Sequence, residues 1–275
     1  MEEPGVKQCC ATFYSSDFAR LLLGDSFHPG GASLTHRLGT LLNLSPHSTV
    51  LDVASGRGTS AIHLAESFGC KVTGVDLSEE NIRLAAEQAR QRGLGSLIGF
   101  QLGDAERLPF EDATFDAIVC ECAFCTFPGK PVAAQQFHRV LKPGGQLGLS
   151  DLTRSGETLP GLEGLLSWIA CIGDALPTER YVAIFREAGF EVGSVEDHSG
   201  ALVEMVRQIQ ARLLGAEIMA GLKKIDLPGV DFATGKQFAQ AALHAVQNGA
   251  LGYSIITARS AARTPLQLEG EPANP

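Results

Sequence analysis

The sequence has no apolar run of eighteen residues or more, which argues against a membrane-spanning helix. Its first ten residues, MEEPGVKQCC, are acidic and carry cysteine, whereas a secretory signal starts basic and continues apolar. No basic run or stripe offsets the formal net charge of -9, so a surface that binds nucleic-acid phosphates is not expected. We therefore expect a cytoplasmic protein that binds neither membranes nor nucleic acid.

Cysteine, by contrast, is plentiful. Seven cysteines are an odd number for a disulfide framework, and a reducing compartment keeps thiols reduced, so metal binding or catalysis is favoured. Three of them fall in CECAFCTFPGK (120–130), directly after an apolar run. A structural zinc site is a minor alternative, because no C-x-x-C pair elsewhere would complete it.

Short apolar or β-branched runs alternate with helical patterns through the first 155 residues. The expected strands are STVLDVA (48–54), CKVTGVDL (70–77), LIGFQLGD (97–104), FDAIVCEC (115–122) and GQLGLSDLT (145–153). The expected helices between them are TSAIHLAESF (59–68), SEENIRLAAEQARQRG (78–93) and PVAAQQFHRVLKPGG (131–145). This alternation predicts an α/β fold with a mostly parallel sheet and helices on both faces.

The second half continues the pattern. We expect helical segments at 162–176, at 178–190 and over a long stretch from 201 to 249, with strands at 191–198 and 252–260. The expected organisation is an N-terminal arm or lid (1–34), a cofactor-binding core (35–155), a C-terminal half that completes the sheet with the 201–249 helical insertion (156–260), and a flexible tail (261–275).

The end of the first expected strand reads LDVASGRGTS (51–60), an acidic residue followed by a glycine-rich turn into a helix. Such a turn lets the backbone approach a ligand closely, at the sheet edge where doubly wound folds bind ligands. About 20 residues further on, Asp76 ends the second strand, where a carboxylate can accept hydrogen bonds from a ribose diol. Asp104 and Ala105 end the third strand.

These ordered motifs resemble the class I S-adenosylmethionine (SAM)-dependent methyltransferases. The resemblance implies a Rossmann-like, doubly wound sheet of seven strands, mostly parallel, with the last strand antiparallel. It also implies a set of cofactor-binding residues, namely Asp52, Ser55, Gly56, Gly58 and Thr59 at the methionine end, Asp76 and Leu77 at the ribose, Asp104 and Ala105 at the adenine, and Cys120 through its backbone. A nicotinamide-binding domain is the alternative, but the turn lacks the third glycine of G-x-G-x-x-G.

The cysteines narrow the resemblance to the arsenite methyltransferases. Those enzymes carry cysteines before the first strand, after the fourth strand, and in a later segment with a glycine turn, Ala-Leu and a helix ending Ala-Gly-Phe. The resemblance implies catalytic roles for Cys10, Cys122 and Cys171, and it makes Cys9, Cys10, Cys122, Cys125 and Cys171 candidate ligands of trivalent arsenic. The second upstream cysteine of the family is absent, and GDSFHPGGASLTHRL stands in its region.

The chemistry of that resemblance is coherent. Soft trivalent arsenic prefers thiolates, and an in-line methyl transfer needs positioning rather than a general base. The resemblance further implies thiols that form a disulfide to reverse oxidation of the product, with glutathione or thioredoxin as reductant. Two other functions stay open, a methyltransferase for another small-molecule acceptor and a non-catalytic module that senses thiols or metals.

Two local questions stay open in the sequence. Glu121 either meets the ammonium group of the cofactor or is a solvated residue. Strict strand alternation would put Cys120 and Cys122 on one face of the sheet. If Cys120 faces the cofactor side and Cys122 the acceptor, the chain must leave the strand near Cys122.

Overall fold

The computed structural model describes residues 17–24, 27–156, 159–163, 171–224 and 230–261, and the structural statements below concern these residues. At its centre is a seven-stranded sheet in the order β3-β2-β1-β4-β5-β7-β6. The strands are β1 (Thr49–Val53), β2 (Lys71–Asp76), β3 (Ile98–Leu102), β4 (Phe115–Glu121), β5 (Leu141–Arg154), β6 (Phe190–Asp197) and β7 (Leu251–Ser260).

The first five strands pair in parallel, and β7 runs antiparallel to both β5 and β6. The expected α/β fold, doubly wound with an antiparallel last strand, is confirmed. The strand order reverses between β1 and β4, and ligands bind outside the carboxyl ends of the strands at such a switch point. The fold therefore predicts a ligand-binding site at the sheet edge where β1 and β4 end.

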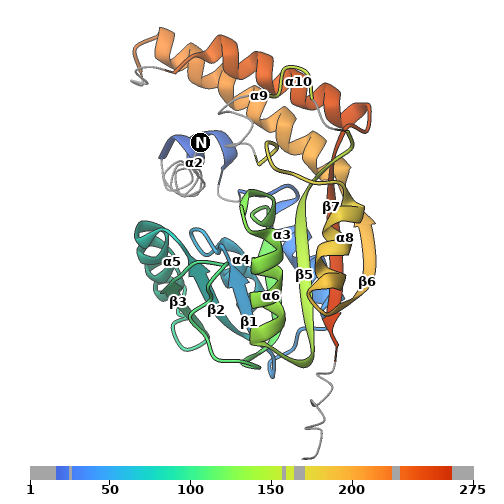
Figure 1. Ribbon diagram of the computed structural model, residues 1–275. Coiled ribbons are helices and arrows are strands. Elements are labelled where there is room, and N and C mark those ends of the chain that lie inside the picture. Colours follow the sequence, from blue (N-terminus) through green and yellow to red (C-terminus); the bar gives the residue numbers. More distant parts are fainter. Residues whose placement is uncertain (1–16, 25–26, 157–158, 164–170, 225–229, 262–275) are drawn as a thin grey trace, which may run out of the picture.

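Helices cover both faces of the sheet (Figure 1). They are α2 (Asp17–Leu23), α3 (Gly31–Leu41), α4 (Thr59–Phe68), α5 (Glu79–Gln91), α6 (Lys130–Val140), α8 (Thr178–Glu187), α9 (Ser199–Gly221) and α10 (Phe232–Gln247), with a short 3-10 turn η1 (Phe124–Thr126). In the described ranges, no helix is long and apolar enough to cross a membrane.

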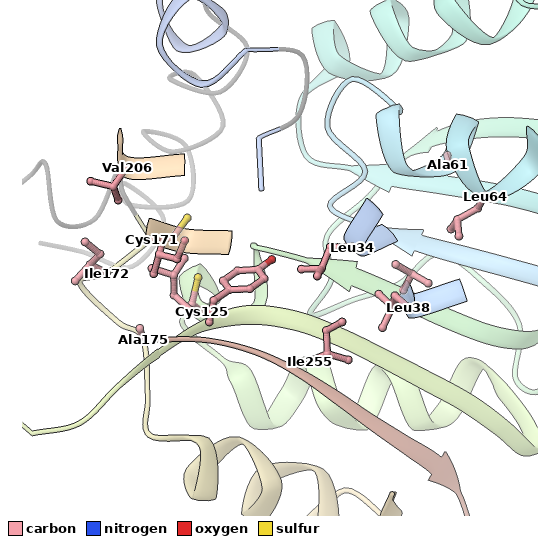
Figure 2. Close-up of a cluster of buried hydrophobic side chains, with 14 of the residues drawn as sticks. Leu34, Leu38, Ala61, Leu64, Cys125, Cys171, Ile172, Ala175, Val206 and Ile255 are labelled. Carbon is pink, nitrogen blue, oxygen red and sulfur yellow. The ribbon is translucent and has the colours of Figure 1, made fainter. Parts of the chain in front are cut away.

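The sheet separates two apolar cores. One core packs α3, α4, α9 and α10 on one face, and the other packs α6 and α8 on the opposite face. Figure 2 shows part of the first core, where Leu34 and Leu38 of α3 meet Ile255 of β7. The central strands β1 and β4 are thus buried on both sides, which explains why their sequences are nearly continuous apolar runs, whereas the edge strand β3 is largely exposed.

Some expected elements differ from the structure. The Lys142-Pro-Gly-Gly145 segment, expected as the end of a helix, belongs to β5, because α6 stops at Val140 and the chain becomes extended at Leu141. The described part of the expected helix 162–176 is not helical, and Leu176 instead makes a bridge to Thr153. The long 201–249 stretch contains most of α9 and all of α10, which lie side by side beyond the end of β5 (Figure 1).

Candidate active site

A pocket opens at the carboxyl ends of β1, β2 and β4, where the strand order predicts it. It is lined by Phe27, His28, Asp52, Val53, Ala54, Ser55, Gly56, Arg57, Thr59, Ser60, Val75, Asp76, Leu77, Asn81, Gly103, Asp104, Ala105, Glu121, Cys122, Ala123, Thr126 and Phe127. Eight of the ten residues expected to bind the cofactor are in this set, and the exceptions are Gly58 and Cys120.

Polar atoms in this pocket lack partners. Asp52 is 2% exposed, and its Oδ2 makes no hydrogen bond. Burial raises the pKa of Asp52 well above its ordinary value, and the charges of Glu121 and Asp76 raise it further. Ser55 Oγ and Asn81 Oδ1 are also buried without a partner. Because buried polar groups are normally paired, a carboxylate left in this state fits a bound cation such as an ammonium group.

Asp76 organises the turn beside Asp52. Its Oδ2 accepts a hydrogen bond from Gly56 N at 2.8 Å, and its Oδ1 accepts from Ser78 N at 2.9 Å and Asn81 Nδ2 at 3.2 Å. Burial raises the pKa of Asp76, and these bonds lower it in part. Gly56 has φ 52°, and a Cβ there would meet nothing within 4 Å, so the turn leaves open space for a ligand. These three hydrogen bonds fix the carboxylate of Asp76, the residue expected at the cofactor ribose, in the pocket wall.

The far end of the pocket holds the other expected residues. Leu77 is 44% exposed and Asp104 is half-buried, and Asp104 Oδ1 accepts a hydrogen bond from Glu106 N at 2.9 Å. An exposed apolar side chain on a pocket wall is suited to a flat ring such as adenine. Gly58 lies behind the wall, because a Cβ there would meet Phe100 Cζ at 2.7 Å.

Glu121, the last residue of β4, is the centre of a buried polar network. Its Oε2 accepts hydrogen bonds from Ser60 Oγ at 2.7 Å and Thr35 Oγ1 at 2.9 Å, and it lies 3.6 Å from His28 Nε2. Its Oε1 accepts from Ser150 Oγ at 3.1 Å. Glu121 is 9% exposed and lines the pocket, so it is not a solvated residue.

The chain leaves the strand at Cys122. This residue has φ 52°, the left-handed region that non-glycine residues rarely adopt, and its N donates to Ser150 O at 2.7 Å. Cys120 packs in the core that α6 and α8 cover, whereas Cys122 contacts the core on the opposite face and lines the pocket. The backbone turn at Cys122 puts the two cysteines against opposite faces of the sheet, whereas the contact of Cys120 with the cofactor stays a prediction, because Cys120 is not among the residues that line the pocket.

Three thiols come together behind this turn. Cys171 Sγ donates to the carbonyl oxygen of Cys122 at 3.6 Å, and it is close enough to the thiols of Cys122 and Cys125 to raise their pKa values. Figure 2 shows the sulfur atoms of Cys125 and Cys171 near each other, beside Ile172. Cys171 also has a left-handed φ of 62°. Cys9 and Cys10, the other expected ligands, lie outside the described residues.

Burial dominates the electrostatics of this group. The pKa of Cys125 is raised well above its ordinary value, first by burial and then by Cys171. For Cys122 the hydrogen bond with Cys171 raises the pKa most, followed by burial. Asp151 Oδ2 accepts from Cys125 N at 2.9 Å, and burial raises the pKa of Asp151 to about 7. Among the described residues, no three His, Cys, Asp or Glu side chains are arranged to hold a metal ion.

Comparisons with known proteins agree with this geometry. A family model described as a methyltransferase domain matches residues 50–145. The 27-O-demethylrifamycin SV methyltransferase of Amycolatopsis mediterranei is 30% identical over 82% of this chain and 82% of its own. Phosphoethanolamine N-methyltransferase 3 of Arabidopsis thaliana is 31% identical over 68% of this chain, but the match spans only 38% of that longer protein.

The chain belongs to the methyltransferase family. A solved phosphoethanolamine N-methyltransferase 2 of Haemonchus contortus, in complex with SAM, superposes with a TM-score of 0.74 at 19% identity over 91% of this chain and 57% of its own. At that identity the likeness shows the fold. The protein is therefore a class I SAM-dependent methyltransferase, as the strand-end motifs predict. The unpartnered Asp52 carboxylate and the open turn at Gly56 suit its cofactor.

Sequence reasoning missed part of the methyltransferase pocket. Phe27 and His28 come from the segment before α3, and Thr126 and Phe127 come from the loop after β4. No strand-end motif marks these positions, because their place in the wall depends on how the segments fold over it. Ser60 was within reach of the sequence, since it follows Thr59 in the first turn of α4.

Proposed function

We propose that this methyltransferase transfers the methyl group of SAM to a trivalent arsenic species, arsenite or methylarsenite, held by thiolates. The carrying observation is the meeting of Cys122, Cys125 and Cys171 from two segments about 50 residues apart, next to the pocket edge that Cys122 lines. When bound, SAM supplies an electrophilic methyl group on a positively charged sulfur. Soft thiolates are the ligands that a thiophilic metalloid prefers.

Backbone strain supports a functional reading of these cysteines. A single buried cysteine is usually a small core residue, as Cys70 is. Cys122 and Cys171, however, both hold the left-handed conformation without being glycine. Such positions cost about 1 to 3 kcal/mol each and cluster at functional sites. Packing of an apolar core does not require two neighbouring cysteines with a left-handed backbone at the edge of a cofactor pocket.

The described thiols do not by themselves form a three-ligand site. We propose that Cys9 or Cys10 supplies the remaining ligand. Each As–S bond would form as a thiol proton leaves with an arsenic-bound oxygen as water. Asp52 would hold the cationic methionine end of the cofactor, and Glu121 would fix the wall beside it through Ser60 and Thr35.

The decisive experiment compares single cysteine variants with the wild-type protein. With arsenite or methylarsenite, SAM and a thiol reductant, Cys122→Ser and Cys171→Ser should lose methylated arsenic products by about hundredfold or more, because a ligand of the acceptor is missing. Cys70→Ser is the matched control, since Cys70 lies just before the amino end of β2, away from the pocket, and its Sγ donates to Leu64 O at 3.5 Å. Products are measured by chromatography with arsenic detection, and SAM affinity by calorimetry. Full activity of both site variants would refute the proposal.

The pH dependence gives a second test. Because the pKa values of Cys122 and Cys125 are raised above their ordinary value, both groups are thiols at neutral pH. Phenylarsine oxide condenses with two thiols to form two As–S bonds, and its oxygen leaves with the thiol protons as water, so no net proton is released. The attacking species is the thiolate, so the rate of binding should increase as pH rises from 6 to 9. Stopped-flow fluorescence would measure this rate. A rate that stays constant across this range would count against attack by these thiols.

A second function, methyl transfer to a small organic acceptor, is supported by the relatives, whose names specify a rifamycin and phosphoethanolamine. In that case His28, which lies on the pocket wall 3.6 Å from Glu121, is the candidate to orient or deprotonate the acceptor. A panel of hydroxyl and amine acceptors, assayed by release of S-adenosylhomocysteine, separates the two functions. Turnover that is unaffected by Cys122→Ser and reduced by His28→Ala would favour the organic acceptor.

A further inference from the structure

Lys130 occupies an unusual place for a cation. It is the first residue of α6 and is only 4% exposed. Lysine is rarely buried unless it is paired, and the start of a helix is the end that disfavours positive charge. Its Nζ donates to Phe127 O at 3.1 Å and forms an ion pair with the carboxylate of Asp174. Burial of this charge at the start of a helix costs free energy, so we expect the Lys130–Asp174 ion pair to have a role in the protein.

The ion pair joins the two segments that carry the thiols. Lys130 and Phe127 end the loop that starts at Cys122, and Asp174 lies three residues after Cys171. Beyond Asp174 the segment is attached to β5, because Arg154 N donates to Leu176 O at 3.2 Å and Leu176 N donates to Tyr181 Oη at 3.1 Å. Among the described contacts, the Lys130–Asp174 ion pair joins the part of this segment between Cys171 and Leu176 to the loop that runs from Cys122 to Lys130.

We propose that Lys130 and Asp174 form a clamp that sets the position of the Cys171 thiol relative to Cys122 and Cys125, and that Lys130 is thereby a positioning residue for capture of the acceptor. This inference rests on the proposed function, because it assumes that the thiols hold the acceptor. In the contacts given above Lys130 touches no thiol, and its bond to the cofactor pocket lining goes to the backbone carbonyl of Phe127. Its effect reaches the site through the backbone of the two segments.

The loop has a separate attachment on its other side. Gly129 N donates to Glu106 Oε1 at 2.9 Å, and Glu106 follows the Asp104–Ala105 wall of the pocket. The pocket-facing residues Ala123 and Thr126 are thus supported independently of Asp174. Loss of the clamp should disturb the thiols more than the cofactor pocket.

The test uses Lys130→Met, which keeps the length of the side chain and removes the charge, and Asp174→Asn, which removes the partner charge at a more exposed position. We expect KM for methylarsenite to increase about tenfold in either variant while kcat at saturation and SAM affinity change little. Lys130→Arg, which keeps a cation, should recover most of the loss. Lys142→Met is the matched control, because it breaks the ion pair with Asp116 at the opposite end of the sheet.

A measurement without arsenic separates failure of the clamp from failure of the proposed function. In a Cys125→Ala background, diamide oxidises Cys122 and Cys171 to a disulfide, and mass spectrometry follows its rate. Lys130→Met and Asp174→Asn should slow this step severalfold if they release Cys171. Unchanged trapping rates overturn the clamp. If wild-type protein neither binds nor methylates trivalent arsenic, the proposed function fails, and the trapping rates still decide the clamp. A KM that stays unchanged in a protein that does methylate arsenic also overturns it.

Discussion

The cofactor pocket (the cofactor half) and the proposed acceptor site at Cys122, Cys125 and Cys171 (the thiol half) differ in how their polar groups are satisfied. In the cofactor half, Asp52 Oδ2 and Ser55 Oγ are buried without partners and line an open pocket. In the thiol half, Cys125 and Asp151 are fully enclosed, and their polar atoms bond to each other and to Cys171. The cofactor half is preorganised for a ligand that supplies the missing charge, whereas the thiol half already pairs within the protein.

This difference implies different costs of binding. A ligand in the cofactor half relieves an electrostatic penalty that the fold already carries. Under the proposed function, a trivalent arsenical would replace existing hydrogen bonds of the thiols, and its oxygens would leave with the thiol protons as water. We therefore expect cofactor binding without large rearrangement, and acceptor binding whose rate depends on pH and on movement of the segment around Cys171. The predictions below test this comparison.

The largest effect concerns Asp151 in the thiol half. Its pKa is raised from an ordinary value of 3.8 to about 7, so between these pH values the folded state holds a proton that the unfolded chain has lost. The free energy of unfolding should therefore fall as pH rises through this window, by about 4 kcal/mol for this group. Asp151→Asn should remove that part of the slope. Chemical denaturation between pH 4.5 and 8 measures it, and parallel slopes for both proteins would contradict the prediction.

The next effect concerns Asp52 in the cofactor half. Asp52→Asn removes the charge that is expected to pair with the ammonium group, and SAM affinity should fall about hundredfold. The same change should raise the thermal stability of the free protein, because it removes a buried charge whose Oδ2 has no hydrogen-bond partner. Calorimetry and thermal denaturation give the two readouts. Asp116→Asn, at the opposite end of β4, should leave affinity unchanged.

Two glycines of the same turn should respond differently. Gly58→Ala would place a Cβ 2.7 Å from Phe100 and 2.9 Å from Ala85 at φ 79°, so it should cost about 2 kcal/mol of stability. Gly56→Ala meets open space and should cost about 1 kcal/mol from its φ of 52° alone. The Cβ added at position 56 enters the pocket, so the loss of SAM binding free energy should be larger than the loss of unfolding free energy. Denaturation and calorimetry on both variants check the ranking.

The smallest effect concerns Leu77 on the pocket wall. Leu77→Ala removes apolar contact area at the end assigned to ribose and adenine, and SAM affinity should weaken about threefold to fivefold. Stability should change by less than about 0.5 kcal/mol, because the side chain is 44% exposed. A loss above about thirtyfold would indicate that Leu77 does more than cover a ring.

The strand-end motifs allowed most of the fold and the cofactor half to be predicted. Asp52, Asp76 and Asp104 sit at the carboxyl ends of neighbouring parallel strands, and parallel strands bring such positions to one edge whatever the loops do. Local periodicity also identified α4 and β4 closely. The periodicity was wrong at Lys142-Pro-Gly-Gly145. The helical spacing of apolar residues in α6 continues as far as Leu141, but β5 begins there and pairs with β4 and β7.

The thiol half could be predicted only in part. Spacing suggested that Cys122, Cys125 and Cys171 meet, but it could not give the left-handed turn at Cys122, since nothing local forces a cysteine into that conformation. Lys130 and Asp151 were missed for a similar reason. Their burial depends on contacts between residues that are 44 positions apart for Lys130 and Asp174 and 26 positions apart for Cys125 and Asp151. Tertiary packing decides such positions, and no short pattern records it.

The last strand has a consequence for how the protein can be divided. Tyr253 Oη donates to Ser150 Oγ at 3.0 Å, and Ser150 Oγ donates to Glu121 Oε1 at 3.1 Å, so a relay of hydrogen bonds runs from β7 to the pocket wall. The matched methyltransferase domain ends at residue 145, before both donors. A fragment cut at that boundary would keep every cofactor motif and still lose the hydrogen bond to Glu121 Oε1. The unit that supports the pocket is therefore larger than the unit that the family model delimits.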